Sequence, residues 1–568
     1  MDDQSDRSNE TTGAEAMVRL LEAHGVRHIF GLCGDTSLPF YDALARLDHP
    51  ITHILTRDER SAAYMADGYA RVTGRVGVCE GPSGGGATYI LPGLVEASES
   101  SIPVLAITTD VATTSAGRFP LTELDQNGLF RPLTKWNGVI PSAQLLPRMV
   151  RQAFRQMTTG RPGAAHLGFP FDVQKAPVDG DDLWSDSRFG SFPALPAGTE
   201  DGAIEEALAA ILSAKSPVIV CGGGVVIAGG EAELQHLAER LDIAVCTTVS
   251  GQGSLAETHP NCVGVVGSNG GVAETRAVVD QADLVIFIGC RAGSVTTERW
   301  RSPAPGTAIV HIDSDPNAIG VNYQTEAMIC ADARLALRAL NAALDANETN
   351  SSFGGAALAQ QAKAAKRAAF IELAESDAQP ILPERVVETF NRLLPDDAIV
   401  VADPGTPCPY FSAYYTLNKP GRHFISNRAH GALGYSLAAS VGAQVGRPDA
   451  KVVAVMGDGS FGFTCGELET VKRLNLPITF VVFSNAVFGW IKAGQKSGFD
   501  GRYYSVDFSR TDHGAVAAAF GLKSWKVEDP ADLEHVLRQA FEANEPTLVD
   551  IIAQPLQDAN APVSEWVA

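Results

Sequence analysis

The sequence predicts an α/β protein built from three doubly wound, parallel-sheet domains. Short apolar, β-rich runs alternate with amphipathic helical stretches along the whole chain, which is the pattern of parallel sheets covered by helices. Two polar, linker-like segments, 178–201 and 347–370, divide this pattern into thirds. We therefore expect domains near residues 1–180, 200–345 and 375–568.

Each third of the chain carries its own set of expected strands. In chain order they are RHIFGLC, VGVCEG and VLAITTD, then PVIVCGGGV, DLVIFIGC and AIVHIDSD, and finally AIVVADPG, KVVAVMGDG, ITFVVFSN and TLVDIIAQ. The 55 glycines suit the tight turns that join such strands to helices. The second linker runs into an alanine-rich stretch, which predicts a helix ahead of the last third.

The composition limits the class of protein. A chain of 568 residues is too long for one hydrophobic core. Its formal charge of −22 argues against nucleic acid or an anionic membrane as partner. The nine cysteines include no CxxC pair, so neither a zinc site nor a disulfide framework is indicated. The first fifteen residues are polar and no apolar run has transmembrane length, so we expect a cytoplasmic protein.

One carboxylate stands out because glycines flank it at the end of an apolar run. In VVAVMGDGSFGF, Asp458 lies between Gly457 and Gly459, and a helix and a second strand then lead to Asn485. In a right-handed βαβ unit both strands end at the same edge of the sheet, where open α/β sheets bind ligands. A carboxylate and a carboxamide there suit Mg²⁺, and the glycines let the main chain approach a diphosphate. The alternative is an ordinary Asp-Gly turn with an unrelated asparagine.

The segment from Asp458 to Asn485 resembles the cofactor motif of thiamine-diphosphate enzymes, specifically the superfamily of acetohydroxyacid synthase, pyruvate oxidase and benzoylformate decarboxylase. This resemblance implies that Asp458, Asn485 and the backbone carbonyl of Val487 hold Mg²⁺. Most members have two consecutive asparagines, whereas Ser484 precedes Asn485 here. Other residues that the motif places at the cofactor are Gly457, Gly459, Ser460 and Gly489.

A second carboxyl is required by the chemistry of this cofactor. Thiamine diphosphate loses its C2 proton to its own aminopyrimidine, which needs a carboxyl group that donates to the pyrimidine N1′ and that burial keeps protonated. The segment 51–78 resembles the activating-glutamate segment of the family and places Glu59 at a strand-to-helix junction. The alternatives are the neighbouring Asp58, or a surface glutamate that merely favours the helix N-terminus. In the family this domain and that of Asp458 come from different subunits, which implies a homodimer and usually a homotetramer.

The segment 429–448 resembles the family stretch that shapes the cofactor. It implies that Leu433 wedges between the two rings and that the Gly431 carbonyl accepts from the 4′-amino group, the alternative for Leu433 being ordinary helix core. His430 is a candidate proton donor, or else a structural histidine. Two further candidates, for contact with the diphosphate, are Gly405 and Thr406.

The substrate pocket departs from the family pattern. The glycine-rich loop with Ser83 and Gly84 matches one wall, and Thr122 lies in the next wall, where acetohydroxyacid synthases have a glutamine that contacts intermediates. That replacement counts against acetolactate synthesis. Trp490 stands where family members carry a substrate-facing apolar side chain. The middle domain of relatives binds FAD, an adenine nucleotide or nothing, and Arg291 matches an arginine of the FAD-dependent members.

The resemblance therefore implies an enzyme that forms or breaks a carbon–carbon bond next to a carbonyl. We expect a 2-keto acid decarboxylase or carboligase resembling acetohydroxyacid synthase, acting on a small 2-keto acid or 2-hydroxyacyl substrate. The alternatives are a 2-hydroxyacyl-CoA lyase or oxalyl-CoA-decarboxylase-like enzyme, and then a flavin-dependent oxidase. A catalytically silent homologue that serves as a binding or regulatory subunit is the alternative from another class.

Overall fold

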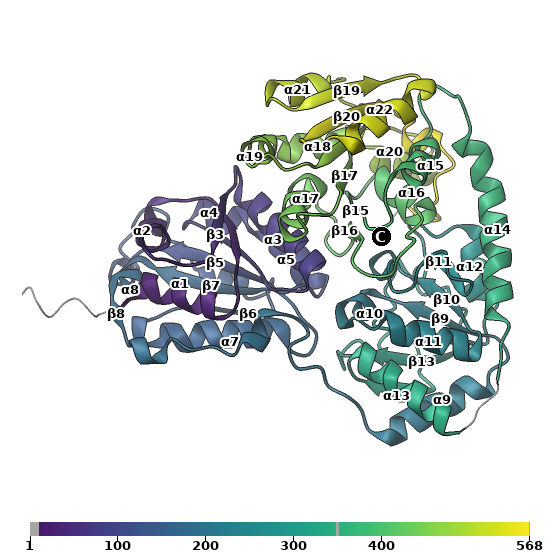
Figure 1. The fold of residues 1–568 in the computed structure, drawn as a ribbon, viewed down its shortest axis with the longest axis horizontal. Coiled ribbons are helices and arrows are strands. Elements are labelled where there is room, and N and C mark those ends of the chain that lie inside the picture. Colours follow the sequence, from purple (N-terminus) through teal and green to yellow (C-terminus); the bar gives the residue numbers. More distant parts are fainter. Residues whose placement is uncertain (1–10, 348–350, 567–568) are drawn as a thin grey trace, which may run out of the picture. The chain divides into compact units, whose positions relative to one another are not determined.

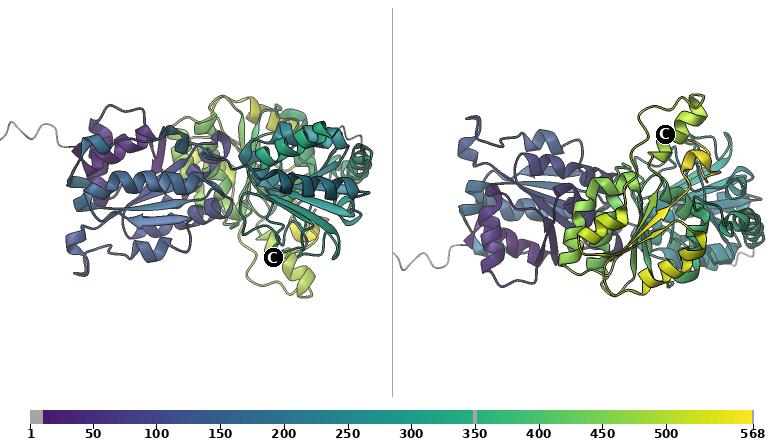
Figure 2. Two further views of the ribbon diagram at one scale, coloured as in Figure 1. Left: turned by 90° about the horizontal axis from the view of Figure 1, so that it is seen from below. Right: turned by 90° about the horizontal axis from the view of Figure 1, so that it is seen from above.

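A computed structural model describes residues 11–347 and 351–566. It contains three parallel six-stranded sheets, one from each third of the chain, and a short antiparallel pair, β1 (Thr11–Thr12) with β8 (Pro177–Val178) (Figure 1). Figure 2 shows helices flanking the strands of each sheet. Because parallel neighbours need crossover connections, which helices supply here, the predicted α/β class is confirmed.

The N-terminal sheet has the strand order β3-β2-β4-β5-β7-β6. Val78, Leu105 and Leu167 of its strands form a core with helices α1 and α7, while α3 and α5 contact the sheet and each other. The strands are β2 (His28–Gly31), β3 (Thr52–Leu55), β4 (Gly77–Gly81), β5 (Val104–Asp110), β6 (Trp136–Val139) and β7 (Ala165–Pro170). The helices are α1 (Gly13–Ala23), α2 (Leu38–Arg46), α3 (Glu59–Thr73), α4 (Gly85–Tyr89), α5 (Leu91–Glu99), α6 (Gln126–Phe130), α7 (Leu146–Thr158) and α8 (Phe171–Lys175).

The central sheet has the order β11-β10-β9-β12-β13-β14. Its strands are β9 (Pro217–Cys221), β10 (Ala244–Thr247), β11 (Cys262–Val265), β12 (Leu284–Ile288), β13 (Ala308–Asp313) and β14 (Ala327–Cys330). Its helices are α9 (Asp201–Ser213), α10 (Gly223–Ala228), α11 (Glu231–Leu241), α12 (Ala273–Asp280) and α13 (Ala333–Ala346). The alanine-rich stretch forms α14 (Gly355–Ala374) as predicted, and residues 348–350 of the second linker lie outside the described residues.

The C-terminal sheet has the order β16-β15-β17-β18-β20-β19. The chain runs outward from β15 to β16 and returns to β17 on the other side of β15, so the strand order reverses between β15 and β17. Such a switch point is where open α/β sheets bind ligands. The strands are β15 (Ile399–Ala402), β16 (Phe424–Ser426), β17 (Val452–Gly457), β18 (Thr479–Ser484), β19 (Lys523–Val527) and β20 (Thr547–Ile552). The helices of this third are α15 (Pro383–Leu393), α16 (Pro407–Tyr414), α17 (Tyr435–Gly446), α18 (Asp458–Thr464), α19 (Leu468–Arg473), α20 (Gly489–Gly498), α21 (His513–Ala519) and α22 (Pro530–Glu542).

The chain forms two compact units. The first holds the residues up to Leu195 together with 429–448 and 469–474, so α17 and all of α19 except Leu468 belong to it. The second holds the rest. The domain boundaries expected from the linkers stay predictions. Among the described residues no helix has the length and apolar composition needed to cross a bilayer. All nine cysteines are described, and none forms a disulfide.

Helices α3 and α17 pack with their backbones in close approach inside the first unit. Two glycines make this possible. A Cβ on Gly68 would overlap the carbonyl oxygen of Ala439, and a Cβ on Gly442 would overlap that of Met65. A side chain at either position would therefore push the two helices apart.

We expect Gly442→Ala to lower the free energy of unfolding by about 1–3 kcal/mol, because the added methyl group overpacks a backbone contact. Gly202→Ala is the matched control, because Gly202 is also helical and has no atom near its Cβ position. That control should be neutral or stabilising by up to about 1 kcal/mol, since alanine favours helix. Urea unfolding of both variants tests the contact, and equal stabilities would contradict it.

Candidate active site

The tips of two neighbouring strands meet at Asp458. This residue follows β17, and Asn485 follows β18, which pairs with β17 in parallel register. Asp458 Oδ2 accepts the backbone N–H groups of Asn485 at 2.7 Å and of Ala486 at 2.6 Å, and Oδ1 accepts that of Gly459 at 2.8 Å. The sequence spacing thus brings Asp458 and Asn485 together as expected for a βαβ unit.

The environment of Asp458 leaves its charge only partly balanced. Burial raises the pKa of its carboxyl above the ordinary value of 3.8, although three backbone N–H groups act in the opposite direction. The side-chain nitrogen of Asn485 is buried, and no hydrogen-bond partner for it lies in the described structure. A cation beside Asp458 would stabilise its ionised form, and the carboxamide oxygen of Asn485, not its nitrogen, would be the second side-chain ligand.

Ser484 stands where most family members have the first of two asparagines, and hydrogen bonds hold its side chain at the end of β18. Its hydroxyl donates to Asp550 Oδ1 at 2.6 Å and lies 2.8 Å from His513 Nδ1. The His513 ring in turn lies edge-on to Phe461, with centroids 5.2 Å apart. The serine therefore takes part in a buried polar network that supports β18, and Asn485 keeps its place at the tip.

Open backbone surrounds the switch point. Gly457 and Gly405 have no atom within 4 Å of a Cβ position, and Gly405 has a φ of +102°, which favours glycine. A Cβ on Gly489 would lie 3.4 Å from Thr406 Oγ1, so the segments after β15 and β18 approach each other. Ser460 is buried in α18, which has only seven residues.

The segment after Asn485 is held by backbone pairing. Val487 forms a bridge with Asp507, and the N–H of Phe488 donates to the carbonyl of Val506 at 2.9 Å. Trp490 is half-buried and packs against Trp566, with ring centroids 5.1 Å apart. Its role toward a substrate stays a prediction, because these contacts place it in the packing of the C-terminal third.

Glu59 begins α3 in the first unit and is 6% exposed. Asp58 is the helix N-cap, and its carboxylate accepts the Arg60 N–H at 2.7 Å. A Cβ on Gly86 would lie 3.0 Å from Glu59 Oε1, so the glycine loop closes over the carboxyl. Burial, and then the charges of Asp58 and Glu80, raise the pKa of Glu59. The alternative of a surface glutamate is therefore wrong, and Asp58 has a capping role.

Glu80, a second buried carboxyl near Glu59, was not predicted from the sequence. Glu80 lies in β4, is fully buried, and accepts a hydrogen bond from the Tyr41 hydroxyl. His53 Nε2 lies 2.9 Å from that hydroxyl and 3.3 Å from Glu80 Oε1. The absence of a side chain on Gly31 leaves room for Glu80. Its only mark in the sequence is an acidic residue inside an apolar run, VGVCEG.

The predicted substrate residues of the first unit are neighbours. The hydroxyls of Ser83 and Thr122 lie 2.7 Å apart, and Ser83 Oγ lies 3.2 Å from Thr36 Oγ1. A Cβ on Gly84 would lie 2.8 Å from Thr122 Cβ, and Gly84 has a φ of +69°. These contacts form a wall of hydroxyl groups at the carboxyl ends of the N-terminal strands.

The loop before α17 carries the remaining candidates. Gly431 has a φ of +74°, His430 is exposed and Leu433 is half-buried. Because Leu433 precedes α17 and is not fully buried, it is not ordinary helix core. The predicted residues thus fall into two sets. One unit holds Glu59, Ser83, Gly84, Thr122, His430, Gly431 and Leu433, and the other holds Gly405, Thr406, Gly457, Asp458, Gly459, Ser460, Asn485, Val487, Gly489 and Trp490.

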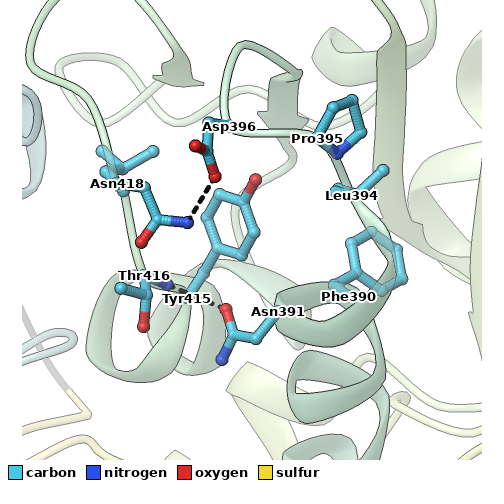
Figure 3. A pocket seen from close by; sticks show the side chains of 9 residues that line it. Phe390, Asn391, Leu394, Pro395, Asp396, Tyr415, Thr416 and Asn418 are labelled. Carbon is cyan, nitrogen blue, oxygen red and sulfur yellow. Dashed lines mark hydrogen bonds between the residues drawn. The ribbon is translucent and has the colours of Figure 1, made fainter.

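A small hollow between α15 and the segment after α16 is unrelated to these residues (Figure 3). Asn391 Oδ1 accepts the Thr416 N–H at 2.9 Å, and Asn418 Nδ2 donates to Asp396 Oδ1 at 2.8 Å. The two asparagines and Asp396 are therefore held by hydrogen bonds within the hollow. None of the candidate residues lines it.

The fold and the two sets of residues define a three-domain thiamine-diphosphate enzyme, and comparison with known families agrees. Residues 11–129 match the N-terminal binding domain of thiamine pyrophosphate enzymes, 204–340 the central domain and 403–551 the C-terminal binding domain. The chain belongs to the thiamine pyrophosphate enzyme family. Thiamine pyrophosphate and thiamine diphosphate are two names for the same cofactor.

Curated relatives include proteins named acetolactate synthase large subunit. The chain is 35% identical to a probable one from Methanococcus aeolicus over 556 residues, 96% of this chain and 92% of the relative. It is 36% identical to a probable one from Methanocaldococcus jannaschii over 554 residues, 96% and 92% of the two chains. It is 32% identical to acetolactate synthase isozyme 3 large subunit from Escherichia coli over 533 residues, 94% and 92% of the two chains.

The buried Glu80 gives stability a predictable pH dependence. Because burial raises its pKa above the ordinary value of 4.5, the folded protein holds this proton more tightly than the unfolded chain does. Its contribution is fully present below about pH 4.5 and is lost as pH rises through the raised pKa of the folded state. We expect the melting temperature of Glu80→Gln, relative to the unmodified protein, to increase between pH 4.5 and pH 8.

Each kcal/mol of this difference corresponds to about 1 °C when a chain of 568 residues unfolds as one unit. Glu205→Gln is the control, since Glu205 is an exposed helical glutamate. A melting-temperature difference for Glu80→Gln that stays constant across this pH range would contradict the assignment.

Proposed function

We propose that the protein is a Mg²⁺- and thiamine-diphosphate-dependent enzyme that forms or breaks a carbon–carbon bond next to the carbonyl of a small 2-keto acid. The observation that carries the proposal is the meeting of Asp458 and Asn485 at adjacent strand tips beside the switch point. The named activity of the relatives, acetolactate synthase, supports the same class of reaction.

The donor groups at this edge fit Mg²⁺. Asp458 supplies a carboxylate, Asn485 a carboxamide oxygen and Val487 a backbone carbonyl, and Mg²⁺ prefers such hard oxygens while keeping positions for phosphate and water. Across residues 11–347 and 351–566, no group of three His, Cys, Asp or Glu side chains could hold a metal ion. A site with one carboxylate therefore needs the diphosphate to complete it, which suits a metal that anchors a cofactor.

The buried Glu59 would hold the proton that activates the cofactor. Bound thiamine diphosphate supplies a C2 carbon that adds to the substrate carbonyl and an electron-accepting ring for the bond that breaks. Burial raises the pKa of Glu59, and no cation is among its described contacts, so the protonated form that could donate to a ring nitrogen and take the proton back is favoured. The glycine loop lies against Glu59 and would limit the access of water to this exchange.

The hydroxyl wall bears on the choice of substrate. Thr122 and Ser83 bond to each other where acetohydroxyacid synthases place a glutamine, so we propose a second candidate, a lyase of the 2-hydroxyacyl-CoA or oxalyl-CoA-decarboxylase kind. Incubation of the purified protein with pyruvate, 2-hydroxyacyl-CoA and oxalyl-CoA, followed by mass spectrometry of the products, separates the two. Acetolactate and CO₂ from pyruvate, with both CoA esters unchanged, would support the synthase. Formyl-CoA, formed with an aldehyde from 2-hydroxyacyl-CoA or with CO₂ from oxalyl-CoA, would support the lyase.

The assembly and the central domain belong to the same proposal. We propose a cytoplasmic homodimer or homotetramer in which two chains complete each site. Arg291, exposed just after β12, lies at the carboxyl edge of the central sheet, where FAD or an adenine nucleotide would bind.

Glu59→Gln should bind thiamine diphosphate but exchange its C2 proton at least about 100-fold more slowly, because an amide cannot donate and regain the proton. The exchange is measured by NMR after quenching in D₂O. The adjacent Asp58→Asn is the matched control and should keep the exchange rate within about twofold, since it preserves the helix cap. Unaltered exchange in Glu59→Gln would refute its role.

Asp458→Asn should weaken Mg²⁺-dependent binding of thiamine diphosphate at least about 10-fold, because a neutral amide replaces the one carboxylate of the metal site. Calorimetric titration of the cofactor at several Mg²⁺ concentrations measures this. Asp529→Asn is the control, because this exposed residue only caps α22. The metal assignment fails if both variants bind the cofactor as the unmodified protein does.

A further inference from the structure

A buried carboxylate on α5 holds the loop that precedes α17. The Glu96 side chain is fully buried. Its Oε2 accepts the backbone N–H of His430 at 2.7 Å and of Gly431 at 3.4 Å, and its Oε1 accepts that of Ala429 at 3.4 Å. Three successive loop residues thus donate to one side chain from more than 300 positions earlier in the chain. All of these residues belong to the same compact unit.

Glu96 is itself fixed from two directions. Arg71 Nη2 of α3 lies 3.2 Å from Glu96 Oε1, and the Ser100 hydroxyl donates to the same oxygen at 2.7 Å. Arg71 Nε also bonds to Asp67 Oδ2 at 2.7 Å, and the hydroxyl of Tyr435, the first residue of α17, donates to that oxygen. The network therefore joins α5, α3 and α17.

The charge balance explains why the loop is needed. One guanidinium, that of Arg71, faces two buried carboxylates, Asp67 and Glu96. Burial lowers the pKa of Arg71, but the carboxylates outweigh this and raise it, so the guanidinium keeps its charge. Burial, and the nearby carboxylate of Glu96, raise the pKa of Asp67. A buried carboxylate is costly without hydrogen-bond donors. The backbone N–H groups of the loop supply those donors to Glu96, which ties the conformation of the loop to the carboxylate.

The loop conformation matters because of what the proposed function assigns to it. Gly431 has a φ of +74°, which favours glycine. The loop lies between β16 and α17 and belongs to neither a helix nor a strand. The family resemblance, on which the proposed function rests, implies that the Gly431 carbonyl and Leu433 contact the aminopyrimidine of thiamine diphosphate. The charge-assisted bonds from Ala429, His430 and Gly431 to Glu96 would fix the peptide units that lead into Gly431, which limits where the Gly431 carbonyl can point.

We propose that Glu96 is a positioning residue, which sets the Gly431 carbonyl and Leu433 for the aminopyrimidine of thiamine diphosphate through its bonds to the loop N–H groups. The inference rests on the proposed function. It assigns Glu96 no contact with cofactor or substrate. Glu96 acts on the tautomer of the bound cofactor through the loop, which separates it from a glutamate that only stabilises the fold.

Glu96→Gln tests the proposal with little change in shape, because the amide removes the charge and turns one acceptor into a donor that faces N–H groups. We expect C2 proton exchange per bound cofactor to slow about 10-fold. We also expect the near-ultraviolet circular dichroism of the bound cofactor to shift between its amino and imino forms. Glu99→Gln, an exposed change on the same helix, should leave both readouts unaltered.

A second comparison separates positioning from loss of stability. Met157→Ala removes a fully buried side chain of α7 in the same unit and should lower the melting temperature without changing exchange or dichroism per bound cofactor. If Glu96→Gln does not fold, Glu96→Asp takes its place, since the shorter side chain keeps the charge but cannot reach the loop, and the same slowing is expected.

The outcomes separate the two proposals. Normal exchange and dichroism in the Glu96 variant would overturn the positioning role, as would equal slowing in Met157→Ala. If the unmodified protein binds no thiamine diphosphate, or if Glu59→Gln exchanges normally, the proposed function itself fails. If those two tests succeed and the Glu96 variant behaves as unmodified protein, only the present inference is lost.

Discussion

The hydrogen bonds that the Asp458 carboxylate accepts from the backbone of the neighbouring strand tip are the contact on which the proposed metal site depends. They lock the ends of β17 and β18 together at 2.7 and 2.6 Å and hold the carboxylate at the edge where the strand order reverses. Because backbone groups supply these bonds, the orientation of Asp458 is set by the sheet. Side-chain freedom is therefore largely removed before any ligand arrives.

The N-terminal unit uses burial of carboxyl groups in three ways. Glu59 lacks a cation, so burial favours its protonated form and suits it to hold a proton. Glu80 shares its buried position with Tyr41 and His53. Glu96 has a guanidinium and three backbone donors, which stabilise a negative charge. The same residue type thus serves as proton store, network member or anchor according to the groups that surround it.

Much of this architecture could be predicted from the sequence, because its signals are local. Alternating apolar runs and helical stretches predict the three sheets, and the spacing of Asp458 and Asn485 predicts two tips at one edge. Glu96 and Glu80 could not be found in this way. Their partners come from elements far apart in the chain, and an acidic residue in an apolar stretch does not reveal whether it is paired, capped or exposed. The supporting network of Ser484 was missed for the same reason.

Helix α3 has a mechanical consequence that follows from where its polar residues lie. Its first residue is Glu59, and Asp67 and Arg71 lie two and three turns further along a rod about 22 Å long. At Gly68 and Gly442 the backbones of α3 and α17 are in contact, with no side chain between them. Because a helix is stiff, a force that slides α3 would move Glu59 and Arg71 together. Arg71 is the residue of α3 that contacts Glu96, so Glu59 and the bonds of Glu96 would be disturbed at the same time.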